Sequence, residues 1–403
     1  MKKSLTKIIL VGFGNVFNAF LGFAFLSTVA KTLDIESFGK YALLATLLVT
    51  VSKLIDFGTN SVYVADSISK DDSTLTDTFY TLKIILLGIS IPVSLVILNL
   101  LKLNTTDIIL YFILGLFAYA INYTLNSFFQ KKEMFLPLVL LNTFPAIIKG
   151  VFAYLMLAGK IYLNLEQAFM IFSLSIFSSS LLWFFLPKEF KKFKTDFSKV
   201  KEYLKKASPA GVSQLIFEGW SSISNAIAKI ANDFSHVGIY SIADKVSNIL
   251  QLGAISIFTV LLPKNAYAKK HHEKYDFKEV FIISILILVL AFFGTFISRF
   301  FVSDFFGDKF IESLPLLGLL IFSTALTSIH TFMENYFFIE EKTNYIMYIN
   351  VGKLALFLIL CWILVPTMSL QGLAWANLIS AVSALIATII FINLDQRKKS
   401  TQE

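Results

Sequence analysis

The sequence predicts an all-α polytopic membrane protein with about 12 transmembrane helices. Of the 403 residues, 56% are hydrophobic and 15% are charged, whereas charged residues make up about 25% of soluble domains. The mean hydropathy of +0.72 is correspondingly high. The apolar residues fall into blocks of about 20, which is the length that an α-helix needs to cross a bilayer.

Twelve apolar blocks reach this length. The first follows Met1, Lys2 and Lys3, a start that is similar to a secretory signal peptide. Its apolar run is too long for the core of such a signal, so we expect a retained first span. In chain order the predicted spans are 7–30, 38–66, 80–101, 108–129, 135–158, 165–186, 207–231, 237–262, 278–302, 313–338, 344–364 and 371–393.

The placement of lysine predicts the orientation of these spans. With alternating crossings, the N-terminus, every second linker and the C-terminal tail lie on one side and carry 23 Lys or Arg. The opposite linkers carry only Lys31, Lys102, Lys160 and Lys309. Because basic residues are enriched on the cytoplasmic side, we expect both termini to be cytoplasmic. The net charge of +8 is then topological and indicates no nucleic-acid partner.

The most basic linker, 187–206, divides the chain into two similar parts. Residues 1–186 and 207–393 each hold six predicted spans, and 394–403 form a cytoplasmic tail. Phe38-Gly39-Lys40-Tyr41 and Val237-Gly238-Ile239-Tyr240 open the second span of each part, 199 residues apart. Both parts begin on the same side, so the sequence predicts two six-helix bundles related by a pseudo-twofold axis along the membrane normal.

Nine charged side chains lie inside the predicted spans. A charge at mid-bilayer costs roughly 2.5–3.5 kcal/mol on insertion scales, so nine of them facing lipid would cost on the order of 25 kcal/mol. We therefore expect them to face one another or a wet interior. They are Lys53, Asp56, Lys149, Glu218, Lys229, Asp244, Lys245, Glu334 and Lys353.

The seventh span, 207–231, carries the clearest polar pattern. Three- and four-residue spacing places its polar residues on one stripe, opposite an apolar face. Such a stripe is typical of a helix that lines a cavity, although interhelical hydrogen bonding would produce the same pattern. The stripe consists of Gly211, Gln214, Glu218, Ser222, Asn225, Lys229 and Asn232.

Other spans add candidate substrate-binding and ion-coupling residues. Lys53 and Asp56 are three residues apart in the second span and can pair locally. The first span offers Asn15 and Asn18, and the eighth offers Asp244 beside Lys245. This polarity of the leading spans of each half predicts a site between the halves.

Lys149 and Lys353 are mid-span cations without an acid one turn away in sequence. They either snorkel or pair across helices, or they attract an anionic substrate such as a phosphate. His330 and Glu334 lie four residues apart and form either a proton site or a static hydrogen-bonded pair.

The sequence contains no motif for catalysis or for ATP hydrolysis. It has no Walker A sequence, no nucleophile elbow, no HExxH and no CxxC. No linker is long enough for a soluble catalytic domain. We therefore expect no cofactor and no metal, and a transport step driven by a proton or sodium gradient, by the substrate gradient, or by another subunit.

Five segments, in chain order, resemble motifs of one transporter family. The last of them departs from the family at Trp375, where a small residue is usual. The segments are Thr32-Leu33-Asp34-Ile35-Glu36-Ser37-Phe38-Gly39-Lys40-Tyr41, Asp56-Phe57-Gly58, Val237-Gly238-Ile239-Tyr240 continuing to Leu262-Pro263, Phe306-Gly307-Asp308-Lys309-Phe310-Ile311-Glu312-Ser313, and Gln371-Gly372-Leu373-Ala374-Trp375-Ala376.

On these segments the chain resembles the Wzx-like O-antigen and polysaccharide flippases of the multidrug/oligosaccharidyl-lipid/polysaccharide (MOP) exporter superfamily. The resemblance implies two six-helix bundles around a central cavity. It also implies movement of an undecaprenyl-diphosphate-linked oligosaccharide to the outer leaflet of the bacterial inner membrane by alternating access. The implied partners are this substrate, membrane lipids and a polysaccharide polymerase or assembly protein, and we expect a monomer.

The resemblance implies that the five mid-span lysines attract diphosphate or acidic sugars, and that Asp56, Glu218 and Asp244 are counter-ions or ion-coupling groups. The polar residues of the first and seventh spans and Glu334 complete the two candidate sets. The substrate-binding set is Lys53, Lys149, Lys229, Lys245, Lys353, Asn15, Asn18, Gln214 and Asn225. The counter-ion or ion-coupling set is Asp56, Glu218, Asp244 and Glu334.

Two alternatives stay open at this point. A multidrug antiporter of the same superfamily would need a cavity rich in carboxylates and aromatic rings, which bind organic cations. The nine charged residues inside the predicted spans are instead five lysines and four acids. A membrane-embedded glycan polymerase would need a sizeable external loop with essential arginines or carboxylates. The only arginines, Arg299 and Arg397, lie near a span end and in the tail.

Overall fold

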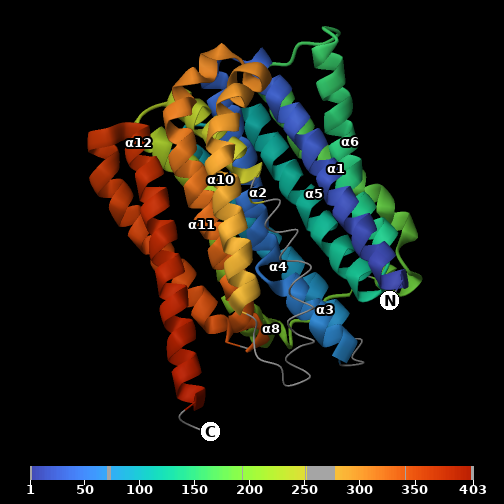
Figure 1. Cartoon of the computed structure of the whole chain (residues 1–403). Helices are drawn as coiled ribbons and strands as arrows, with labels where there is room; N and C mark the ends of the chain where they lie inside the picture. Colours follow the sequence, from blue (N-terminus) through green and yellow to red (C-terminus); the bar gives the residue numbers. More distant parts are fainter. Residues whose placement is uncertain are drawn as a thin grey trace. The chain divides into compact units, whose positions relative to one another are not determined.

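The chain forms an all-helical membrane protein, which confirms the predicted fold class (Figure 1). The computed structural model describes residues 2–69, 74–192, 194–249, 251, 277–340 and 342–400, and no strand occurs among them. They fold as two compact units, Met1–Ser222 and Ile223–Glu403.

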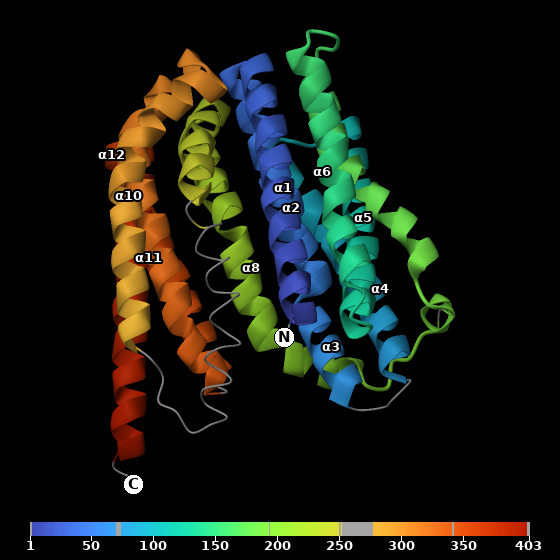
Figure 2. The same ribbon diagram turned by 45° about the vertical axis from the view of Figure 1, so that its right-hand side comes forward.

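The N-terminal unit contains helices α1 to α7 and most of α8. In chain order these are α1 (Lys2–Thr32), α2 (Ile35–Asp56), α3 (Thr59–Ser69), α4 (Thr74–Leu100), α5 (Thr106–Lys131), α6 (Phe135–Leu157), α7 (Leu165–Leu174), the 3₁₀ segments η1 (Ser175–Phe185) and η2 (Lys188–Lys191), and α8 (Val200–Ala231). Helix α1 lies alongside α6 (Figure 2).

The C-terminal unit continues from the end of α8 through a helix at 234–249. It then contains α10 (Phe277–Phe306), η3 (Asp308–Ser313), α11 (Leu314–Ile339) and α12 (Thr343–Ser400). Helix α11 packs against both α10 and α12 (Figure 2).

Eight of the described segments are long and apolar enough to cross a membrane. One of them, Asn344–Arg397, is 54 residues long and has a non-helical residue, Ser369 (φ 49°, ψ −129°), so it holds two of the predicted spans. The remaining predicted spans coincide with α1, with α8 and with the helix at 234–249, whose predicted continuation to 262 lies outside the described residues. The chain is thus a multi-pass membrane protein.

A carboxylate cap begins the second span of each predicted half. Asp34 accepts a hydrogen bond of 2.9 Å from the Ser37 amide at the start of α2. Asp233, 199 residues later, accepts one of 2.9 Å from the amide of His236. The hydrogen bonds to Ser37 hold the pKa of Asp34 below its ordinary value, as hydrogen bonds to a carboxylate do. The internal repeat therefore extends to a shared capping residue.

The apolar pattern of 38–66 suggested one continuous helix, but the structure shows two helices in this span. It breaks at Phe57 and Gly58, which both have positive φ (38° and 72°), and α3 resumes at Thr59. A Cβ at Gly58 would lie 2.6 Å from the carbonyl oxygen of Ala207, and one at Gly211 would lie 2.6 Å from that of Phe57. The break therefore packs directly onto the backbone of α8, and glycine at both positions permits this contact.

We expect Gly58→Ala to destabilise the protein much more than Gly159→Ala. Both glycines have similar φ values (72° and 66°), but a Cβ at Gly159 meets no atom within 4 Å. The shared backbone strain costs about 1–2 kcal/mol, and the clash with α8 should add about 1–3 kcal/mol for Gly58→Ala alone. Unfolding of the two full-length variants in detergent measures the difference, and equal losses would contradict the contact.

Candidate functional site

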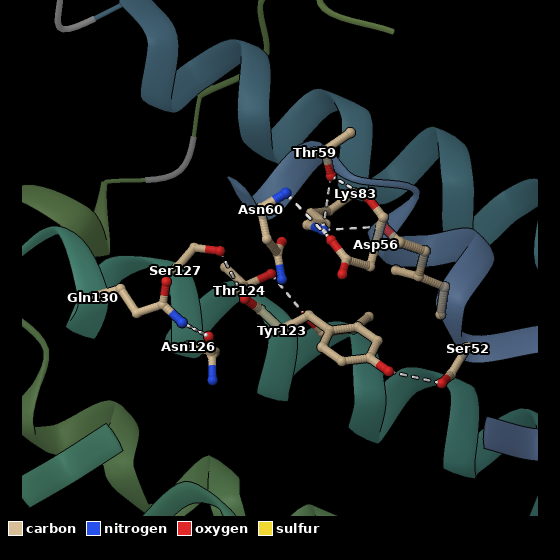
Figure 3. A network of polar contacts seen from close by, with 12 residues as sticks. Ser52, Asp56, Thr59, Asn60, Lys83, Tyr123, Thr124, Asn126, Ser127 and Gln130 are labelled. Atoms are coloured by element: carbon tan, nitrogen blue, oxygen red, sulfur yellow. Dashed lines mark hydrogen bonds and ion pairs between the residues drawn. The ribbon is translucent and has the colours of Figure 1, made fainter. Parts of the chain in front are cut away.

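The break between α2 and α3 leaves two helix ends inside one membrane span. Backbone groups at such ends must find partners within the protein, because the hydrocarbon offers none. Lys83 of α4 donates hydrogen bonds of 3.0 Å to the carbonyl oxygen of Ile55 and of 3.0 Å to Thr59 Oγ1 (Figure 3). The Phe57 amide donates to the carbonyl oxygen of Lys53 at 2.7 Å. Lys83 thus closes the C-terminal end of α2.

Asp56 performs the matching role for α3. Its Oδ1 accepts the backbone amide of Asn60 at 3.2 Å, and its carbonyl oxygen accepts the Thr59 hydroxyl at 2.5 Å. The Lys83 ammonium lies 3.9 Å from the Asp56 carboxylate, and both side chains are buried. Each charge therefore sits at the helix end whose dipole favours it, a cation at a C-terminus and an anion at an N-terminus.

A second ion pair borders this buried pair. Lys53 Nζ lies 3.4 Å from Glu218 Oε1 of α8, with side chains 15% and 38% exposed. The same ammonium lies 5.3 Å from the centre of the Tyr123 ring, and the hydroxyl of Tyr123 is 3.0 Å from Ser52 Oγ. Tyr119 packs against Tyr123 at 5.6 Å between ring centres. We call Lys53, Asp56, Lys83, Tyr123 and Glu218 the N-unit charge cluster.

This cluster differs from the sequence-based expectation in two respects. Lys53 and Asp56 take Glu218 and Lys83 as partners, in place of the local pair with each other that their spacing suggested. Lys83 itself was missed, because it lies near the edge of the predicted block 80–101, where lysines commonly reflect topology. The signal that could have found it is the acid in the neighbouring span, which needs a cation.

Among the described residues, the other candidates of the N-terminal unit form no ion pair or hydrogen bond with the cluster. Lys149 of α6 is half-buried and lies 5.0 Å from the centre of the Phe172 ring, and no carboxylate pairs with it among the residues that the structure describes. Oδ1 of Asn18 is buried without a hydrogen bond. Gln214 is half-buried on α8. The side chain of Asn15 lies outside the described part of α1.

In the C-terminal unit, the candidates near the start of the eighth span are bound to local partners. Asn225 is fully buried and accepts a hydrogen bond of 3.0 Å from the Ser241 hydroxyl. This contact is an interhelical hydrogen bond, which was the alternative to a cavity lining for the polar stripe of 207–231. Lys229 lies 4.6 Å from the centre of the Phe234 ring. Asp244 accepts a bond of 3.2 Å from Asn248 and lies 4.0 Å from the ammonium of Lys245.

Glu334 and Lys353 belong to a buried group between α11 and α12. Nε2 of His330 lies 3.4 Å from Glu334 Oε1, and Asn350 of α12 donates to the same oxygen at 3.3 Å. Lys353 donates to Thr327 Oγ1 at 3.1 Å and interacts electrostatically with Glu334. Lys353 is therefore not the isolated cation that its sequence neighbours indicated.

Comparison with known sequences identifies one family. The profile described as "Polysaccharide biosynthesis protein" matches residues 4–269. A search of curated protein sequences finds no match.

Several solved structures share the fold across nearly the whole chain. One is described as the inward-facing conformation of a multidrug resistance MATE family transporter of the MOP superfamily (TM-score 0.72, 15% identity, 94% of this chain and 96% of that one). Another is the lipid II flippase MurJ in an inward closed conformation (TM-score 0.71, 16% identity, 96% and 87%). A MOP superfamily transporter from Pyrococcus furiosus is also similar (TM-score 0.61, 15% identity, 96% and 95%).

We expect Lys83→Met to lower the free energy of unfolding by about 3–5 kcal/mol, because it leaves the Asp56 carboxylate buried without its cation. The matched control is Lys40→Met, which removes the half-buried partner of the exposed Glu36 (2.7 Å) and should cost less than about 1 kcal/mol. Adding Asp56→Asn to Lys83→Met should restore part of the loss. Unfolding of the full-length variants in detergent tests this, and a loss no larger than that of Lys40→Met would refute the role of Lys83.

Proposed function

Because the chain belongs to the polysaccharide biosynthesis protein family, we propose that it is a flippase for an undecaprenyl-diphosphate-linked oligosaccharide. It would carry this lipid from the inner to the outer leaflet of the bacterial cytoplasmic membrane, with both termini in the cytoplasm. The diphosphate is the group that its intramembrane cations would recognise. The similarity to the MurJ fold supports a lipid cargo, since that protein is described as a lipid II flippase.

The observation that carries the proposal is the Lys53–Glu218 pair. Its separation of 3.4 Å exceeds the roughly 2.7–2.9 Å of a strong charge-assisted hydrogen bond. Both side chains are partly exposed, whereas Asp56 and Lys83 beside them are buried and hydrogen-bonded. Lys53 is therefore a cation whose counter-ion, Glu218, can be replaced, and it lies beside the fixed pair of Asp56 and Lys83. A diphosphate would take the place of Glu218.

Lys149 supports the same chemistry from another helix. It is a half-buried cation on α6, and no carboxylate pairs with it among the described residues. Leaving such a charge in the membrane costs roughly 2.5–3.5 kcal/mol, and a substrate anion would recover part of that cost. Lysine suits a moving phosphate, because it acts as a point charge on a flexible stem.

A multidrug antiporter is the second candidate, and the similarity to the MATE transporter structure favours it. That function would use exposed carboxylates to hold an organic cation. In the N-unit charge cluster Asp56 already has two roles, as a cap of α3 and as the partner of Lys83, which leaves Glu218 as the available acid. The cluster therefore suits an anion better than a cation.

We expect Lys53→Ala and Lys149→Ala each to lower surface polysaccharide in the cells that make it, at unchanged protein level. Losing one charge-assisted contact of about 1.5–3 kcal/mol should slow translocation about tenfold to a hundredfold. Lys→Arg should be partly tolerated at both positions, since the charge remains. Lys309→Ala, at a half-buried position of η3 near the end of a span, is the control and should leave the glycan unchanged. Normal surface glycan in both alanine variants would argue against the cationic site.

Transport of a cationic dye separates the two candidate functions. The purified full-length protein in liposomes should not move such a dye, because Lys53 already neutralises Glu218, the exposed acid of the cluster. Dye transport that Glu218→Gln abolishes would instead establish the antiporter.

A further inference from the structure

A second buried polar group lies in the C-terminal unit, away from the residues used above. His330 and Glu334 occupy successive turns of α11, and Asn350 and Lys353 lie three residues apart on α12. His330, Glu334 and Lys353 are 2%, 7% and 8% exposed. The group therefore joins three buried titratable side chains across the contact of α11 with α12.

The Glu334 carboxylate is poorly satisfied for an ionised group. His330 Nε2 is 3.4 Å away and forms no hydrogen bond, and the Asn350 amide is 3.3 Å away. A buried carboxylate that stays ionised usually has several short hydrogen bonds or a close cation. Lys353 donates instead to Thr327, at 3.1 Å. The geometry is that of a carboxyl group able to hold a proton.

The surrounding helices place few charged side chains near His330, Glu334 and Lys353. Among the described residues, Lys353 is the charged side chain that interacts with both His330 and Glu334. Asp395, farther along α12, accepts from Tyr336 and Lys342. The other elements beside α11 carry their charged residues near helix ends or in a pair. Asp244 and Lys245 pair on the helix at 234–249. The remaining residues are Lys278, Glu279, Arg299 and Asp304 on α10, and Asp308, Lys309 and Glu312 on η3.

The neighbours of Glu334 are unsuited to a metal cation. Hard cations take about six oxygen ligands, but the groups that approach Glu334 Oε1 are nitrogen atoms of His330 and Asn350. The ammonium of Lys353 already supplies positive charge to the same group. In the part of the chain that the structure describes, no cluster of three His, Cys, Asp or Glu could hold a metal ion.

We propose that Glu334 is a proton-exchange site of the C-terminal unit and that the ion coupled to transport is the proton. One proton binds the carboxylate and converts it to a carboxylic acid, so the charge of the group rises by one. The electrostatic attraction between Lys353 and Glu334 is then lost, and the attraction between α11 and α12 weakens. The coupling rests on the proposed transport function, whereas the proton binding stands without it.

Infrared difference spectroscopy of the purified full-length protein in lipid tests the binding. A protonated-carboxyl band should appear as the pH is lowered, and it should be missing in Glu334→Gln. The control Glu312→Gln, at an exposed position of η3, should retain it. If Glu334→Gln does not fold, Glu334→Asp keeps a carboxyl group and should move the band. A band that neither substitution at Glu334 alters would overturn the proposal.

Two further measurements identify the ion and its neighbour. Replacing sodium chloride with choline chloride should leave the titration unchanged, and competition by sodium would overturn the assignment to a proton. In Lys353→Met the band should persist to higher pH, because the positive charge that opposes protonation is gone. An unchanged titration in this variant would contradict the grouping of Glu334 with Lys353.

The coupling has a separate test that can fail independently of the binding. Translocation of an undecaprenyl-diphosphate-linked oligosaccharide in proteoliposomes should respond to a pH gradient in the wild type and lose this response in Glu334→Gln. Translocation that ignores the gradient in the wild type would refute proton coupling while leaving the flippase itself in place. Absence of any translocation would refute the proposed function, and the infrared titration would still decide the proton site.

Discussion

The contact of Lys83 with the broken second span is the interaction on which the N-terminal unit depends. A helix break inside a membrane leaves carbonyl and amide groups that lipid cannot satisfy. The ammonium of Lys83 closes α2 at Ile55, and its carboxylate partner Asp56 caps α3. The two glycines at the contact with α8 allow the break to lie against another backbone. The charge pair, the break and the close helix contact therefore form one feature.

In the proposed function, the charges beside this fixed pair act on a ligand. Lys53 and Glu218 are more exposed than Asp56 and Lys83 and farther apart than a strong ion pair requires, which is the basis for proposing that a diphosphate replaces Glu218. In the C-terminal unit Glu334 is buried with long contacts only, which is the basis for proposing that it exchanges a proton. Lys83 and Asp56 thus close a helix break, while offering a cation and holding a proton are the roles that we propose for Lys53 and Glu334.

The apolar blocks predicted the described helices and the fold class correctly, because both depend on local composition. They could not predict the break after Asp56, since the apolar pattern continues across Phe57 and only a positive φ and the contact with α8 reveal it. The partners of Lys53 and Asp56 were also out of reach. Each lies on another helix, 165 and 27 residues away along the chain, and helix packing alone decides that they meet. The polar stripe of α8 was visible, but its members serve different ends, because Asn225 bonds to Ser241 while Glu218 meets Lys53.

The most direct test of the account is a leaflet assay on the purified protein in liposomes. An undecaprenyl-diphosphate-linked oligosaccharide is placed in one leaflet, and its arrival in the other is followed with a glycan-directed enzyme that cannot cross the membrane. The account predicts translocation by the wild type that slows about tenfold or more in Lys53→Ala and that excess free diphosphate inhibits. Translocation that is equally fast in Lys53→Ala, or that occurs equally with a neutral lipid-linked glycan lacking the diphosphate, would contradict it.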